Sequence, residues 1–260
     1  MAQEMSLGLI EELMDRAWPA PDREDTGGWV MRAAEGVTQR ANSVWTREQP
    51  DDHESAVRAA TRWYRSRRLP LIFQIFEDER STGLNAVLDA QRFTRQSETL
   101  IMVRQGGTLP AAPRDGWANG VEISEEPSEE WLRLWWSVDG RGGDAELEIA
   151  RNILSSCPSI YALVRDDDGA PAAVGRLALV EGRGGIYCMA TAAKHRRRGC
   201  GRQVLDALLT AGSRRGVSEF WLLVMASNTG ARALYEGARF AEHGRYLYRQ
   251  ARPQRALSGC

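Results

Sequence analysis

The sequence predicts an α/β protein, layered in the α+β manner and built from two units. Apolar runs with strand character alternate with amphipathic helical segments through the second half of the chain. A stretch rich in Gly, Pro and Ala, 105–119, is typical of a linker. The pattern that follows this stretch also occurs before it, as a repeat. We therefore expect a first unit over 1–104, a linker over 105–119 and a second unit over 120–252.

The elements of the second unit follow from local signals. Ser128 precedes two glutamates, as expected at a helix start. The turn DDDGAP separates two apolar runs, and apolar residues such as Val204 and Leu208 recur at helical spacing. In chain order we expect a strand over 121–124, helices from 128 and over 144–155, strands over 160–166, 172–180 and 185–191, a helix over 201–215, a strand over 219–226, a helix over 228–237 and a strand over 240–249.

The repeat relates residues 57–104 to the residues 147 positions later. Twelve of the 48 aligned positions are identical without a gap. The identities fall on the same succession of helix, strand, helix and strand, which makes chance a poor explanation. We therefore predict two structurally related units, the first of them shortened on its N-terminal side.

Composition and charge exclude several classes of protein. With 34 Lys and Arg against 35 Asp and Glu, no global attraction to nucleic acid or membrane is expected. Residues 1–14 carry glutamates and no basic region, so no secretory signal is expected, and no apolar run is long enough to span a membrane. Three scattered histidines and four cysteines without CxxC pairing predict no metal site and reduced thiols in a cytoplasmic protein.

The segment 189–209 carries the chemistry, because it joins a strand, a basic turn, Gly199-x-Gly201 and a helix. Glycines permit a tight turn and leave backbone N–H groups uncovered, and a helix start offers further N–H donors. The pattern predicts a phosphate or pyrophosphate site. Mobile positive charge around it comes from Lys194, Arg196, Arg197, Arg198 and Arg202.

Three other interpretations of this segment fit less well. A nucleic-acid or localisation patch is disfavoured by the neutral chain and by the position at a single strand-to-helix turn. A nucleotide P-loop requires GxxxxGK[ST], which is absent. A dinucleotide-binding turn requires a third glycine, where Val204 stands. A phosphate-binding loop in another fold remains.

Two motifs carry a resemblance to a known family. Arg196-x-x-Gly199-x-Gly201 resembles the pyrophosphate loop of GNAT-superfamily N-acetyltransferases, and Asn228-x-x-Ala231-x-x-Leu234-Tyr235 resembles their second signature. The usual Gly-Phe ending is Arg239-Phe240 here. The two motifs occur in the family's order, with a helix and a strand between them. The arrangement resembles tandem GNAT proteins of actinobacteria, closely over 120–249 and only by pattern before that.

The resemblance implies a fold and a set of roles. Each unit would be a GNAT-like domain with a mixed, mostly antiparallel sheet flanked by helices. Acetyl-CoA would be the cosubstrate, with no metal. Tyr235 would protonate the departing thiolate, which suits a phenol because its ordinary pKa of about 10 exceeds the thiol's of about 8.5. The implied contacts to pantetheine and pyrophosphate are Met189, Ala190, Thr191, Arg196, Arg197, Arg198, Gly199, Cys200, Gly201, Arg202 and Asn228.

Two features of the implied site stay open. The base that takes the proton from the amine is Glu181, Tyr187 or a bound water. Three tryptophans in the first helix of the second unit either form a packed stripe or line an acceptor pocket; they are Trp131, Trp135 and Trp136. Direct attack by the amine needs no covalent intermediate on Cys188 or Cys200.

The repeat indicates that the first unit has lost the site. Moving the signature back by 147 places Gln49, Asp52 and Glu54 at the phosphate loop, where the acids would repel a pyrophosphate. Ser81 stands for the asparagine and Leu88 for the tyrosine. We expect this degenerate GNAT-like domain to bind no cofactor, and instead to wall the acceptor site or to complete a pseudo-dimer.

The sequence thus predicts an N-acetyltransferase that moves acetyl from acetyl-CoA to a primary amine in a ternary complex. A transferase using a longer acyl-CoA and a non-catalytic acyl-CoA-binding regulator are the alternatives. The acceptor is a small molecule or a peptide or protein amine, without nucleic-acid or membrane partners. The protein is expected to be a monomer, formed as a pseudo-dimer, or a homodimer.

Overall fold

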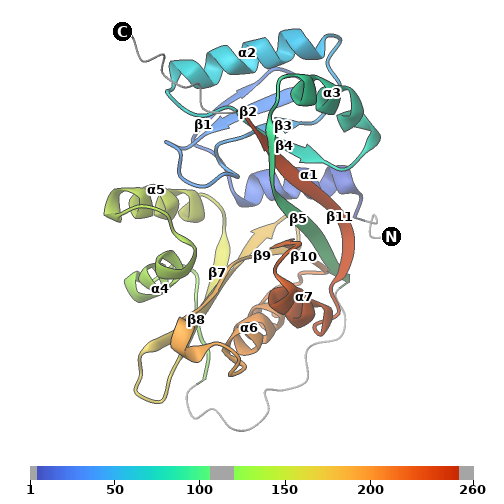
Figure 1. Ribbon diagram of the computed structural model, residues 1–260. Coiled ribbons are helices and arrows are strands. Elements are labelled where there is room, and N and C mark those ends of the chain that lie inside the picture. Colours follow the sequence, from blue (N-terminus) through green and yellow to red (C-terminus); the bar gives the residue numbers. More distant parts are fainter. Residues whose placement is uncertain (1–4, 106–119, 252–260) are drawn as a thin grey trace. The chain divides into compact units, whose positions relative to one another are not determined.

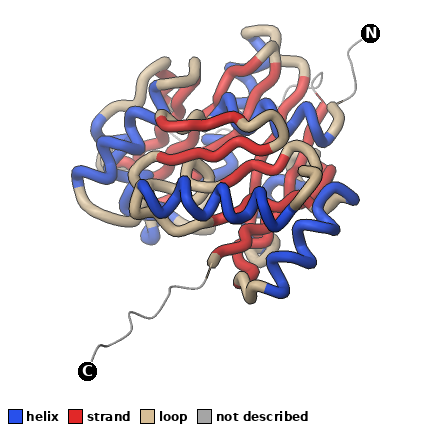
Figure 2. Tube along the Cα trace, turned by 90° about the horizontal axis from the view of Figure 1, so that it is seen from above, coloured by secondary structure: helices blue, strands red, loops and turns tan. Residues whose placement is uncertain are grey.

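The computed structural model describes residues 5–105 and 120–251, which form two compact units (Figure 1). Unit 1 takes the described residues of Met1–Pro19, Ile101–Val224 and Asn228–His243. Unit 2 takes those of Ala20–Leu100, Met225–Ser227 and Gly244–Cys260. Of the expected linker, Gln105 ends a strand, and 106–119 lie outside the described residues, as does residue 252. In each unit the helices, blue in Figure 2, pack on the strands, which are red.

Unit 1 holds most of the second half of the chain. Its strands run in the order β10-β9-β8-β7-β6, with β10 parallel to β9 and the other neighbours antiparallel. The predicted mixed, mostly antiparallel sheet is confirmed. Its elements are α1 (Leu7–Ala17), β6 (Glu122–Ser124), α4 (Glu129–Asp139), α5 (Asp144–Ser155), β7 (Ser159–Arg165), β8 (Pro171–Val180), β9 (Arg183–Thr191), the 3-10 turn η2 (Ala193–His195), α6 (Cys200–Arg214), β10 (Glu219–Met225) and α7 (Thr229–Glu236).

Alternation along the strands of unit 1 assigns its helices to two faces. Tyr161, Arg176 and Tyr187 are cross-strand partners and share one face, where Trp131 of α4 packs its ring on Tyr161 at 5.0 Å between centroids. On the other face α6 packs on β8, and a side chain at Gly175 would collide with Val204 and Leu208. The sheet therefore lies between α6 and the pair α1 and α4.

The structure places residues 5–19 in unit 1, whereas we expected 1–104 to form one unit. The reason is the packing around Arg176, which is fully buried. Its guanidinium donates to the carbonyls of Ala17 at 3.0 Å and Leu154 at 3.1 Å, near the carboxyl ends of α1 and α5, where a cation is favourable. The Trp18 ring lies 5.7 Å from that of Tyr187. The contacts of Ala17 and Trp18 join residues more than 150 positions apart, and no local sequence pattern predicts them.

Unit 2 contains the rest of the first half and the end of the chain. Its strands run in the order β1-β2-β3-β4-β11, with β3 parallel to β4 and the others antiparallel. Phe73 and Leu88 are fully buried in its core. Its elements are β1 (Asp22–Asp25), β2 (Trp29–Ala33), β3 (Val44–Thr46), α2 (His53–Ser66), β4 (Ile72–Phe76), η1 (Glu79–Ser81) and α3 (Thr82–Ala90), with parts of β5 (Thr94–Gln105) and β11 (Ala241–Gln250).

The elements of the repeat lie in matching register. The starts of α2 and α6, of β4 and β10, of α3 and α7, and of β5 and β11 each differ by 147 positions. The two units differ in the number of residues just before α2 and α6. Val44 and Gly184 face the equivalent residues Phe73 and Phe220, yet α2 begins nine residues after Val44 and α6 begins sixteen after Gly184. The longer stretch in unit 1 holds the end of β9 and the glycine turn.

Candidate active site

The glycine turn opens α6 without a side-chain cap. Gly199 is the residue before the helix and has φ +86°, a left-handed conformation that favours glycine. A Cβ built on Gly199 meets nothing within 4 Å, and one on Gly201 meets only Thr191 and Leu234 at ordinary contact distances. No side chain caps the helix start. The first N–H groups of a helix lack partners within it, so this turn presents donors to an anion.

The arginines around the turn divide into two groups. Arg197 and Arg198 are exposed, and Arg197 also has a left-handed φ of +63°. Arg202 is held along its helix, because it donates to Asp206 at 2.7 Å and to the Gly237 carbonyl at 3.3 Å. Arg196 is exposed and acts electrostatically on Asp139, the last residue of α4. The arginines predicted from the sequence therefore surround the turn, but Arg202 and Arg196 already interact with other residues.

An ion-pair cluster anchors the chain just before the turn. Lys194 donates to the Asp166 carboxylate at 3.1 Å, and Nε2 of the buried His195 lies 3.0 Å from the same oxygen. The Ala170 backbone N–H, followed by Lys194, holds the pKa of Asp166 below its ordinary value. This cluster ties η2 to the β7–β8 turn. Lys194 accordingly serves as an anchor.

Strand β9 separates from β10 toward the glycine turn. Their parallel pairing runs from Arg183–Glu219 to Ile186–Leu222, whereas β9 stays paired with β8 as far as Thr191. A β-bulge lies opposite Gly175, where Cys188 has φ +54°. Of the predicted pantetheine residues, Met189 places its sulfur over Gly175, Ala190 is buried and Thr191 lies beside Gly201. The strand edge that faces away from β8 therefore leads to the turn.

The second motif places two side chains on α7. Asn228 caps the helix, and its Oδ1 accepts from the Ala231 N–H at 3.1 Å. Tyr235 is 6% exposed and packs against Phe240, with 6.2 Å between ring centroids. Burial, followed by the charge of Asp139, raises the pKa of Tyr235 above its ordinary value. The phenol therefore stays protonated at neutral pH.

Sequence reasoning did not single out Asp139, whose charge acts on Tyr235. Packing around its carboxyl raises the pKa of Asp139, although the residue as a whole is exposed, and the Trp135 side chain and the charge of Arg196 oppose this rise. Both residues considered as the base already have partners. Glu181 pairs with Arg16, and the Tyr187 hydroxyl accepts from Trp221 Nε1 at 3.0 Å. No sequence signal distinguishes Asp139, because only tertiary packing brings the end of α4 near α7.

The structure distinguishes between the two interpretations of the α4 tryptophans, a packed stripe and an acceptor pocket. Trp131 and Trp135 are 1% and 4% exposed, with ring centroids 5.9 Å apart. Trp131 also donates to the carbonyls of Ala162 and Gly175. They form the packed stripe. Trp136 is partly exposed and donates to the Gly142 carbonyl at 3.2 Å.

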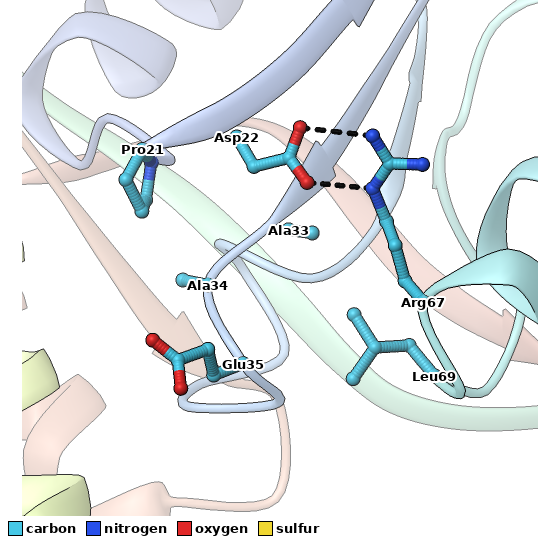
Figure 3. Close-up of a pocket in the computed structure, with 7 residues that line it drawn as sticks. All are labelled: Pro21, Asp22, Ala33, Ala34, Glu35, Arg67 and Leu69. Carbon is cyan, nitrogen blue, oxygen red and sulfur yellow. Dashed lines mark hydrogen bonds and ion pairs between the residues drawn. The ribbon is translucent and has the colours of Figure 1, made fainter.

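A cavity of about 360 Å³ lies in unit 2, and none of the predicted site residues lines it. Figure 3 draws the residues that do. Its charged members are Asp22, Glu35 and Arg67. Arg67 donates to both carboxylate oxygens of Asp22, at 2.6 and 3.1 Å, and lies over the Trp63 ring at 3.6 Å. Its charge is thus already neutralised by Asp22. Across 5–105 and 120–251, no helix is long and apolar enough to cross a membrane, and no three metal-ligating side chains gather.

Comparison with known proteins identifies the family. Residues 8–249 match the family model described as "Probable histone acetyltransferase Rv0428c C-terminal". The uncharacterised N-acetyltransferase YobR of Bacillus subtilis is 27% identical over 242 residues, which is 92% of this chain and 96% of the relative.

Solved structures give the same result for the fold. The GCN5-related N-acetyltransferase from Kribbella flavida superposes with a TM-score of 0.70 at 18% identity, over 96% of this chain and 97% of that one. A tandem GNAT protein from the clavulanic acid biosynthesis pathway superposes with 0.62 at 12% identity, over 95% and 89%. The chain belongs to the Rv0428c C-terminal family and is a GNAT-superfamily acetyltransferase.

Proposed function

We propose that this protein transfers acetyl from acetyl-CoA to a primary amine by direct attack in a ternary complex, as a cytoplasmic monomer or homodimer. The observation that carries the proposal is the start of α6, which has no side-chain cap, beside the end of β9 that lies beyond its pairing with β10. A helix start binds phosphate through its N–H groups, and a strand edge binds an extended chain with amides through its own backbone. Acetyl-CoA offers both groups.

The residues present fit that cosubstrate. The turn from Arg196 to Arg202 would hold the pyrophosphate with backbone donors and arginine charge. The backbone of Met189, Ala190 and Thr191 would pair with the pantetheine arm. Because Asn228 uses its oxygen for the cap, its amide N–H₂ group can donate to the same arm. When bound, acetyl-CoA supplies the thioester that the amine attacks.

Tyr235 is the proposed acid for the departing thiolate. A phenol whose pKa is raised keeps its proton at neutral pH until a strong acceptor forms beside it. Unit 2 offers no equivalent. Its helix start is closed by Asp52, which accepts from the N–H groups of Glu54 and Ser55 at 2.9 and 3.1 Å. We propose that unit 2 is a degenerate GNAT-like domain without a cofactor site.

The acceptor is proposed only as a class. A primary amine on a small molecule, a peptide or a protein meets the chemistry of the site, and acceptor specificity resides in the residues around the shared core.

Two measurements test the function. Calorimetric titration with acetyl-CoA is expected to show one site per chain, and two equivalent sites would contradict the proposal for unit 2. Release of free thiol is then followed with a panel of small amines and lysine peptides. Binding without thiol release from any of them would favour the acyl-CoA-binding regulator.

Tyr235→Phe is expected to lower turnover roughly 100-fold or more while acetyl-CoA binding survives, since general acid catalysis contributes about 10²–10⁴-fold. Tyr161→Phe is the matched control. Tyr161 is equally buried in unit 1, but its hydroxyl donates to the Leu154 carbonyl. Equal turnover in wild type and Tyr235→Phe would remove Tyr235 from the mechanism.

A further inference from the structure

The Asp166 carboxylate joins two segments of unit 1 that are distant in sequence. Asp166 directly follows β7 and is 8% exposed. Its Oδ1 accepts from the backbone N–H groups of Asp168 at 3.2 Å and Ala170 at 2.8 Å, which closes the β7–β8 turn. Its Oδ2 lies 3.1 Å from Lys194 Nζ and 3.0 Å from Nε2 of the buried His195. One carboxylate therefore fixes both its own turn and η2.

The sheet explains why these two segments meet. Strand β8 pairs with β9 as far as Ala173 and Thr191, and the Ala192 N–H donates to the Ala172 carbonyl at 2.9 Å. The end of β9 therefore lies beside the start of β8, which the β7–β8 turn immediately precedes. The His195 N–H then donates to the Ala192 carbonyl at 2.8 Å and closes η2. Backbone hydrogen bonds thus hold the chain as far as η2.

The glycine turn after η2 lacks bonds of this kind. Across the described residues, no hydrogen bond engages the backbone N–H groups of Arg197, Arg198 and Gly199. These are donors that the proposed pyrophosphate would use. A turn whose donors await a ligand is not fixed by its own bonds, so its position depends on its two ends. One end is α6, and the other is η2, which ends at His195.

The contacts of Asp166 with η2 depend on its negative charge. The Ala170 N–H, followed by Lys194 and then the charge of His195, holds the pKa of Asp166 below its ordinary value, so the carboxylate is ionised at neutral pH. Nε2 of His195 makes no hydrogen bond among the described residues, and its approach to Oδ2 therefore acts through charge. An amide in place of the carboxylate would offer no such charge and would release both side chains of η2.

We propose that Asp166 is a positioning residue for acetyl-CoA, an inference that rests on the proposed function. Through Lys194 and His195 it fixes η2, and with it the glycine turn whose backbone donors would meet the pyrophosphate. The carboxylate has the same sign of charge as the phosphates, so its own field opposes binding, whereas its contacts preorganise the donors. The two effects have opposite signs. The direction in which affinity changes therefore distinguishes positioning from simple electrostatics.

The test measures the affinity for acetyl-CoA by calorimetry in wild type, Asp166→Asn and Asp166→Glu. Asp166→Asn should weaken binding roughly 10-fold, the size expected when one hydrogen bond to a phosphate loses its geometry, although the change removes a negative charge. Asp166→Glu should restore part of the affinity because it restores the charge. With an amine that wild type acetylates, Asp166→Asn should raise the KM for acetyl-CoA and leave kcat unchanged.

Glu219→Gln is the matched control within unit 1. Glu219 is 2% exposed and accepts from Arg183 at 2.8 Å and from Gln105 at 3.1 Å. Arg183 begins β9, so this pair lies at the end of the strand opposite to the glycine turn. Both variants break a buried acid's contact with a basic side chain and should lose stability. Only Asp166→Asn should also lose affinity for acetyl-CoA.

A second variant, Lys194→Gln, keeps the test independent of folding, because the Lys194 side chain is 67% exposed. It should weaken acetyl-CoA binding in the wild-type background and have little further effect in Asp166→Asn, since the two residues act as a pair. Unchanged affinity in Lys194→Gln would overturn the inference even if Asp166→Asn failed to fold. An undiminished effect in the Asp166→Asn background would also overturn it, because Lys194 would then act on the phosphates without Asp166.

Two further results contradict the positioning role. Equal or tighter binding of acetyl-CoA by Asp166→Asn would show that the carboxylate acts only through its field or not at all. An equal loss of affinity in Glu219→Gln would show a general effect of stability. Both results leave the proposed transferase activity standing. If wild type itself binds no acetyl-CoA, the proposed function fails and the role of Asp166 fails with it.

Discussion

The starts of α6 and α2 occupy equivalent places in the repeat but have opposite character. At α6 a left-handed glycine precedes an uncapped helix flanked by exposed arginines. At α2 the Asp52 carboxylate occupies the first N–H groups, and Glu54 adds a second negative charge. Under the proposed function the equivalent helix start would bind an anion in unit 1, whereas a side chain closes it in unit 2. A few residues at the helix start make this difference.

The two units also differ in the segment before each of these helices and in the next helix along the chain. Unit 1 has seven more residues between its parallel strand pair and the helix, which accommodate the bulge and the end of β9 beyond its pairing with β10. On the second helix, Asn228 caps α7 with its side chain, whereas Ser81 makes no such cap for α3. Tyr235 stands where unit 2 has the fully buried Leu88. Unit 1 thus has a capping asparagine and a tyrosine at these positions, whereas unit 2 has a serine that does not cap its helix and a buried leucine.

The largest expected effect is a loss of stability at Leu88, the residue of unit 2 that is equivalent to Tyr235. Leu88→Ala should destabilise the protein by about 3 kcal/mol, because it leaves a cavity in a closed core. The affinity for acetyl-CoA and the ratio of one site per chain should not change under native conditions. Denaturant unfolding and calorimetry measure the two effects. A change in stoichiometry would show that Leu88 belongs to a second cofactor site.

Two glycines that flank α6 test the proposed anion site, one as the variant and the other as its matched control. Gly199 and Gly216 flank the two ends of the helix, both have φ above +80°, and neither has an atom within 4 Å of a built Cβ. Valine at either should cost about 1–2 kcal/mol of backbone strain. Only Gly199→Val should also weaken acetyl-CoA binding, by roughly 30-fold, about 2 kcal/mol. Equal affinities in the two variants would argue against the turn as the phosphate site.

The smallest effect concerns the closed helix of unit 2. Asp52→Ala removes the α2 cap and should lower the free energy of unfolding by about 1 kcal/mol. The variant should bind one acetyl-CoA per chain, as wild type does, because unit 2 also lacks the seven additional residues that precede α6 in unit 1. If opening this helix start created a second site in a calorimetric titration, the cap alone would distinguish the two units.

Local patterns carried much of the fold. From β6 onward, the expected strands and helices begin within a few residues of their predicted positions, because apolar periodicity and turn residues are local signals. The register of the repeat was also legible, since it is a relation between two stretches of sequence. The glycine turn could be found because a left-handed residue before a helix has a short sequence signature. For the same reason Asn228 and Tyr235 were identified as a pair on one helix.

Contacts between distant residues were decided by the tertiary structure alone. The assignment of α1 to unit 1 depends on Arg176 reaching the Ala17 carbonyl, 159 positions away. The charge of Asp139 acts on Tyr235 although the two residues are 96 positions apart, and Glu181 pairs with Arg16 from the other end of the chain. The sequence determined the elements and the glycine turn by itself, because these depend on neighbouring residues. Packing decided which charges act on the tyrosine, because burial and charge fields sum over residues far apart in the chain.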